Sequence, residues 1–82
     1  MPKLKKTADD LRHDKDRRLT GLILDYAARR SMKGPQIAKA AGMAYSTFGD
    51  RMRHPETWRR GELMEVFRVL AVPEEDKARV EW

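Results

Sequence analysis

The sequence predicts an all-α fold, a compact bundle of four to five short helices. Apolar residues recur with a helical period in several segments, and Gly and Pro separate these segments. No segment alternates with the two-residue period of a strand. With 82 residues the chain has the size of one small domain, which buries roughly 60–65% of the surface that its unfolded form exposes.

The first helix is predicted over residues 16–32. Gly34 is expected to end the helical segment in the left-handed conformation that often follows a helix. The charged segment 1–14 is either a basic N-terminal arm or an extension of this helix, with Thr7 as a candidate capping residue. Residues 15–82 are predicted to form the domain proper. The apolar stripe of the first helix is formed by Leu19, Leu22, Ile23 and Tyr26.

Two short helices are predicted next, over residues 35–41 and 44–53. Pro35 suits the first turn of a helix, and the tight turn between the two helices needs a positive φ, which Gly42 supplies. Phe48 is expected to point into the core, and Ala38 is small enough to let the two helices cross. Around Phe48, the helical period of about 100° per residue places Ala44 and Met52 inward, Tyr45 and Arg51 at the margins, and Ser46, Asp50 and Arg53 outward.

A fourth helix is predicted over residues 60–71 and a short one after Pro73. Arg59 is a poor N-cap for the fourth helix, and Trp58 is expected to pack on Leu63 at its start. Val80 and Trp82 form the apolar side of the last helix. The apolar stripe of the fourth helix is formed by Leu63, Val66, Phe67 and Leu70.

Positive charge gathers around the two central helices. Residues 29–60 carry eight Lys/Arg and two Asp/Glu, whereas residues 61–82 carry three and six. Two short helices joined by a tight glycine turn indicate a helix-turn-helix, in which the second helix fits the major groove of a DNA duplex. A clustered basic segment is typical of a phosphate-bearing partner. The alternative is a charged face whose only role is solubility.

The segment PQIAKAAGMAYSTFGDRMRHPETWRRGELMEVFRVLAV resembles the lambda-repressor/Cro class of helix-turn-helix domains, and within it small phage and prophage regulators. The resemblance covers about residues 19–80 and implies a lambda-repressor-like fold and sequence-specific binding of duplex DNA by a cytoplasmic, nucleoid-associated transcription regulator such as a repressor. Three positions depart from the pattern: Arg51 stands where an aliphatic residue is usual, Arg59 stands where the cap of the fourth helix is often Thr, and Gly49 lies inside the recognition helix. The residues that carry the likeness are Ile37, Ala38, Gly42, Ser46, Thr47, Phe48, Arg51, Met52, Pro55, Glu56, Gly61, Glu62 and Leu63.

The resemblance implies that the start of the helix over 44–53 reads bases. Ser46 can donate to or accept from a base, Asp50 can accept from a cytosine amino group, and Arg53 can reach guanine. Each residue also has a structural alternative: Asp50 and Arg53 pair on the surface, Tyr45 belongs partly to the core, Ser46 caps the helix, and Gly49 is a neutral packing choice. The expected base-reading set is Tyr45, Ser46, Thr47, Gly49, Asp50 and Arg53.

Contacts to phosphate are expected from the cations and amides around the motif. Such contacts position a protein on DNA without specifying the sequence. Arg51 has an alternative role in an ion pair with Glu56, and the basic arm with Lys3, Lys5 and Lys6 either wraps the duplex or has no role. The expected phosphate-contacting set is Lys33, Gln36, Lys39, Arg51, His54, Arg59 and Arg60.

Other functional classes find less support in the sequence. His13 and His54 lie in unrelated segments, and the chain has no cysteine and no glycine-rich phosphate loop, so we expect neither an enzyme nor a metal or cofactor site. We expect no membrane partner and no small-molecule ligand. Duplex DNA is the expected partner, with a homodimer on a two-fold site left open. The main alternative is a helix-turn-helix module that binds another protein, and single-stranded RNA ranks below both.

Overall fold

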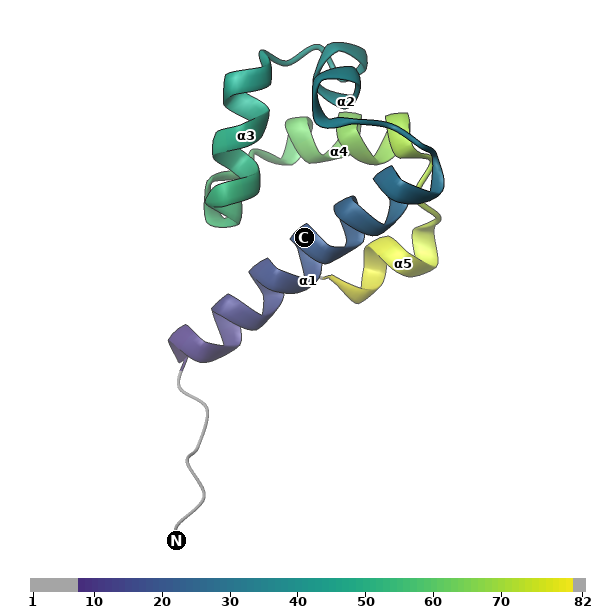
Figure 1. Cartoon of the computed structure of the whole chain (residues 1–82). Helices are drawn as coiled ribbons and strands as arrows, with labels where there is room; N and C mark the ends of the chain where they lie inside the picture. The colour runs from purple at the N-terminus through teal and green to yellow at the C-terminus, as the bar shows by residue number, and fades with distance from the viewer. Residues whose placement is uncertain (1–7, 81–82) are drawn as a thin grey trace, which may run out of the picture.

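The computed structural model describes the backbone of residues 8–80 and the side chains of residues 14–80. This part of the chain is helical and contains no strand, which confirms the predicted all-α class (Figure 1). The elements are α1 (Ala8–Arg29), α2 (Gly34–Ala40), α3 (Tyr45–Arg53), the short 3-10 helix η1 (Pro55–Thr57), α4 (Arg60–Leu70) and α5 (Glu74–Arg79).

The first helix is longer at its N-terminus than the apolar period indicates. It begins at Ala8, so the charged residues from Ala8 onward continue α1 beyond the packed part of the domain (Figure 1). The predicted start at residue 16 was wrong because the apolar stripe marks only the part of α1 that packs on other helices. The alternative that the charged segment extends this helix agrees with α1 over residues 8–14. The predicted arm with its lysines, the capping role of Thr7, and Trp82 lie outside the described residues.

The end of α1 also differs from the prediction. The left-handed residue is Ser31, with φ of 53°, and not Gly34. The Ser31 N–H donates to the Ala28 carbonyl and the Met32 N–H to the Ala27 carbonyl, at 3.1 and 2.9 Å, which is the Schellman pattern of helix termination. Gly34 instead opens α2, where an added Cβ would lie 3.1 Å from the Tyr45 ring. The glycine at position 34 is not required by a positive φ, and a side chain there would crowd the Tyr45 ring of α3.

The turn between α2 and α3 forms as predicted around Gly42. Its φ is 74°, its N–H donates to the Lys39 carbonyl, and the Met43 N–H donates to the Ala38 carbonyl. This is again the Schellman pattern, here with the residue that tolerates positive φ without steric cost. Ala71 ends α4 in the same conformation, with φ of 52°.

The core lies where α1, α2, α3 and α4 meet. Most of the predicted apolar positions are buried, although Leu22 and Met52 are only partly so. The prediction was wrong for Ala44, which is exposed because it is the N-cap of α3 and lies outside the helix. Ala27 and Val72 were not anticipated as core residues. The buried residues are Leu19, Ile23, Tyr26, Ala27, Ile37, Ala38, Phe48, Leu63, Val66, Phe67, Leu70, Val72 and Val80.

Polar contacts join the end of α1 to α4 and α5. The Arg30 side chain donates to the carbonyls of Leu70 and Ala71 at 3.0 and 3.3 Å, which occupies acceptors at the end of α4. The Tyr26 hydroxyl donates to the Asp76 carboxylate of α5, and this hydrogen bond raises the pKa of the Tyr26 phenol above its ordinary value. These contacts fix the C-terminal end of α1 against α4 and α5. None of the helices over residues 8–80 is both long and apolar enough to cross a membrane.

Candidate nucleic-acid interface

α2 and α3 are joined by the four-residue turn 41–44 and pack against each other, and α2 also packs on α4 (Figure 1). The sequence allows this packing because Ala38 of α2 is small and fully buried. α3 is anchored by Phe48, which is 5% exposed and meets the Trp58 ring edge-on with ring centroids 6.0 Å apart. One face of α3 is therefore fixed in the core, and the other is left on the surface.

The outward face of α3 carries most of the expected base-reading residues. Tyr45 is 58% exposed, which removes the alternative that it belongs to the core. Ser46, Asp50 and Arg53 are also exposed, as their helical phase predicted. Thr47 and Gly49 are half-buried on the flanks of this face.

The first turn of α3 is not capped by a side chain. Its N-cap is Ala44, and Ser46 is the second helical residue, so Ser46 does not have the capping role that was considered for it. The exposed Ser46 hydroxyl lies on the surface at the end of α3 where the resemblance places base contacts.

Asp50 and Arg53 form the surface ion pair that was the alternative to base reading. The Arg53 guanidinium donates to the Asp50 carboxylate at 2.5 Å, and the two side chains are 67% and 62% exposed. A pair this exposed stabilises a protein by only about 0.2–1 kcal/mol. It neutralises charge on the outward face of α3, and a ligand can open it at little cost.

Gly49 lies beneath the Arg53 side chain. A Cβ added at Gly49 would meet only the end of that flexible chain, with Nη1 at 3.5 Å. No contact among the described residues therefore requires glycine here, although glycine inside a helix costs about 1 kcal/mol relative to alanine. The absent side chain leaves the α3 backbone open to close approach from outside.

We expect Gly49→Ala to raise the free energy of unfolding by about 0.5–1 kcal/mol, because alanine has the higher helix propensity. If the α3 backbone approaches DNA closely at this point, the same variant binds its duplex more weakly. Thermal denaturation followed by circular dichroism and fluorescence anisotropy with a labelled duplex would measure the two effects. A variant that is more stable and binds equally well would show that Gly49 is a neutral packing choice.

Exposed cations lie on the segments that precede and follow α3 in the chain. Lys33 and Lys39 have no ion pair with the side chains of residues 14–80, so their charges are available to a ligand. The Gln36 amide oxygen accepts from the Lys33 N–H at 2.8 Å, so Gln36 caps its own helix. The exposed members of the expected phosphate-contacting set are Lys33, Gln36, Lys39, His54, Arg59 and Arg60.

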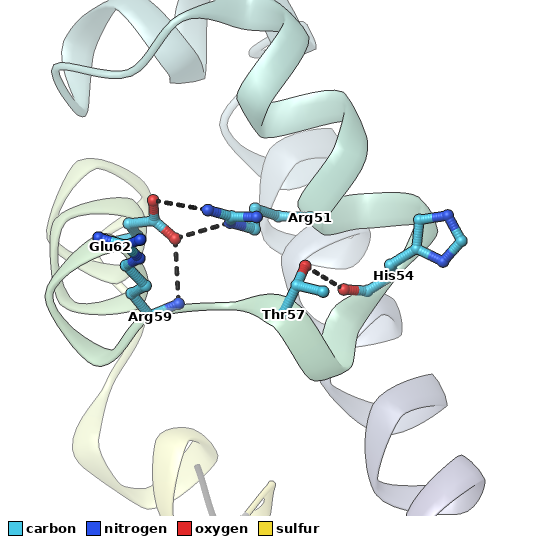
Figure 2. A network of polar contacts seen from close by, with 5 residues as sticks. All are labelled: Arg51, His54, Thr57, Arg59 and Glu62. Atoms are coloured by element: carbon cyan, nitrogen blue, oxygen red, sulfur yellow. Dashed lines mark hydrogen bonds and ion pairs between the residues drawn. The ribbon is translucent and has the colours of Figure 1, made fainter.

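Arg51 is the exception in that set. Its guanidinium donates twice to the Glu62 carboxylate of α4, at 2.9 and 3.4 Å, and the two side chains are only 20% and 21% exposed (Figure 2). The sequence suggested Glu56 as the ion-pair partner of Arg51, but the partner in the structure is Glu62. Glu56 instead lies 3.7 Å from the His54 ring nitrogen. Arg51 therefore joins α3 to α4, and the structure places it away from the expected phosphate role.

Glu62 also accepts from the Arg59 N–H, at 3.0 Å, and so caps the start of α4 (Figure 2). The hydrogen bond from Arg51 is the main cause that lowers the pKa of Glu62 below its ordinary value of 4.5. Thr57 closes the η1 turn by donating its hydroxyl to the His54 carbonyl at 2.6 Å. Sequence reasoning missed the role of Glu62, although a glutamate three residues after an N-cap is a known capping signal.

The lowered pKa of Glu62 predicts a loss of stability in acid. Folding favours the ionised carboxylate, so this contribution is complete above pH 4.5 and is lost as the pH falls towards the lower pKa of the folded state. Glu62→Gln keeps an oxygen for the Arg59 N–H but loses the ion pair, so we expect its stability to fall less between pH 6 and pH 3. Urea denaturation across this range would measure the difference. Glu65→Gln, which removes an exposed pair with Arg68, is the matched control and should follow the wild type.

Comparison with known proteins gave no match: no family model fits the chain, and no curated protein or solved structure is detectably similar. Over the described residues, no three His, Cys, Asp or Glu side chains are grouped closely enough to hold a metal ion.

Proposed function

We propose that this protein is a sequence-specific, duplex DNA-binding transcription regulator of the phage or prophage type. In this proposal α3 is the recognition helix in the major groove, and α2 braces it against the DNA backbone. Ser46, Asp50 and Arg53 read bases, together with Tyr45 and the flanking Thr47 and Gly49.

One observation carries the proposal. α3 is anchored by the buried Phe48 on one side and exposes a polar face on the other, with the exposed cations Lys33, Lys39 and Arg59 on neighbouring segments. A helix with an exposed polar face fits the major groove of B-DNA, and cations beside it suit the flanking phosphates. The pairing of Arg51 with Glu62 supports the same interpretation, because it fixes α3 relative to α4 and leaves the outer cations to the ligand.

The test is selection from a randomised pool of duplex DNA at near-physiological salt. We expect one enriched motif, and a palindrome with half-sites about one helical turn apart if the regulator acts as a homodimer. Salt matters, because contacts to phosphate alone give binding that falls steeply as the salt concentration rises. Binding without an enriched motif would show that the protein binds duplex DNA non-specifically, and the proposed sequence specificity would be wrong.

A second candidate function is a protein-interaction module. Leu24 of α1 and Met64 of α4 favour it, because these apolar side chains are 57% and 55% exposed. If no duplex binds in the selection, this candidate replaces the first.

A further inference from the structure

The outward face of α1 carries an apolar surface that the described residues leave open. Leu24 and Gly21 line an open hollow whose opposite wall is formed by Met52 of α3 and Pro55 of η1. A glycine inside a helix costs about 1 kcal/mol relative to alanine. An added Cβ at Gly21 would meet no atom of the described residues within 4 Å, so packing among them does not explain this glycine.

We propose that this surface, defined by Gly21, Leu24, Met52 and Pro55, binds a second copy of the chain, with the two α1 helices antiparallel about a two-fold axis. A two-fold interface must be complementary to itself. Seating Leu24 over Gly21 of the partner subunit places the partner subunit's Leu24 over Gly21 in turn. The missing side chain at position 21 is then the space that an exposed leucine fills.

Charge supports a second copy as the occupant. The rim of the hollow carries Asp16 and Glu56 together with Arg17 and Arg53, so it is balanced within a chain of net charge +5. The net charge of each copy opposes association through a strongly basic face, and this rim adds no net charge to that repulsion. Two copies can approach through a surface that is apolar and whose rim carries equal numbers of positive and negative side chains.

A flanking pair of side chains fits the same register. Arg18 and Asp25 line one hollow on the other flank of α1, so they lie on the same side of the helix. In the antiparallel arrangement, Arg18 of one copy lies within two residues, or about 3 Å along the helix axis, of Asp25 of the partner subunit. Asp25 already lies 3.0 Å from Arg29 of its own helix, in an exposed pair, so the partner subunit's Arg18 would be a second cation beside this carboxylate. The two-fold axis repeats the contact on the other copy.

The inference deepens the proposed function, because it assigns the surface that would join two recognition helices. Met52 and Pro55 lie at the end of α3 and just after it, so a copy bound in the hollow would lie next to α3. Self-association can be measured without DNA. The absence of a dimer and the absence of DNA binding would therefore be detected in two separate experiments.

The first experiment is sedimentation velocity of the full chain without DNA, up to high micromolar concentration. We expect a monomer–dimer equilibrium that Leu24→Glu shifts to monomer, with at least about a tenfold rise in the dimer dissociation constant, equivalent to 1.4 kcal/mol. Met64→Glu is the control, because Met64 is equally exposed but lies on α4. A monomer at every concentration, or a dimer that withstands Leu24→Glu, would overturn the proposal.

A charge exchange tests the register independently of the apolar contact. We expect Arg18→Asp and Asp25→Arg each to weaken the dimer, and the double variant to restore it, because the exchanged charges are again opposite across the two-fold axis. Circular dichroism of each variant checks that the domain is folded. Two single variants that weaken the dimer without restoration in the double variant would contradict the antiparallel register.

Discussion

Replacing Phe48 with alanine is expected to lower the free energy of unfolding by about 3–5 kcal/mol, because it leaves a cavity beneath α3. Phe48 is 5% exposed and packs against Trp58, so few neighbours can move to fill the space. Small domains are often stable by only about 5 kcal/mol, and the variant would then be largely unfolded at 25 °C. Urea denaturation followed by circular dichroism would measure the change.

Two further variants make this result interpretable. Phe48→Leu keeps most of the volume and should cost only about 1.5 kcal/mol, so its stability is measurable even if the alanine variant does not fold. Tyr45→Ala removes a ring of similar size from the same helix, but from an exposed position, and should change stability by no more than about 0.5 kcal/mol. Equal losses for Tyr45→Ala and Phe48→Ala would contradict the assignment of the two faces of α3.

Variants on the two sides of the interface should separate base reading from phosphate contact. We expect Asp50→Ala to change the preferred base at one position by about 1–3 kcal/mol, because in the proposed orientation its carboxylate accepts from a base edge. Ser46→Ala should also alter preference. Lys39→Ala should instead weaken binding to all sequences about equally. It should also reduce the slope of the logarithm of the binding constant against the logarithm of the salt concentration by about the amount expected for one phosphate contact.

The measurement is anisotropy of labelled duplexes that carry each base at each selected position, at two salt concentrations. Asp50→Ala also releases Arg53 from its ion pair, so Arg53→Ala is needed to separate the two side chains. The proposed orientation would be wrong if Lys39→Ala altered base preference while Ser46→Ala and Asp50→Ala did not.

The faces of the helices could be predicted well from the sequence. Apolar period alone placed Ile23 and Phe67 in the core. With Phe48 taken as the inward direction, the helical period placed Ser46, Asp50 and Arg53 on the surface. The prediction failed for Ala44 because it assumed that the helix already included this residue. Helix ends depend on capping and backbone hydrogen bonds, which periodicity does not report.

Partners across helices could not be predicted. Glu56 is close to Arg51 in the sequence, but Glu62, 11 residues away, is the residue that α4 brings to it. The contact of Arg30 with the carbonyls at the end of α4, 40 residues away, was not anticipated either. Such contacts depend on how helices cross, and a single sequence carries no direct record of the crossing.

The sequence by itself determined the all-α class, the buried stripe of each main helix, the glycine turn at Gly42 and the outward direction of the polar residues of α3. These features are local, because they follow from the helical period and from backbone preferences within a few residues. The tertiary structure alone decided that Arg51 pairs with Glu62, that Arg30 donates to carbonyls at the end of α4, and that Gly34 lies close to the Tyr45 ring. These features depend on which helices approach each other, and that is settled by the packing of the whole core.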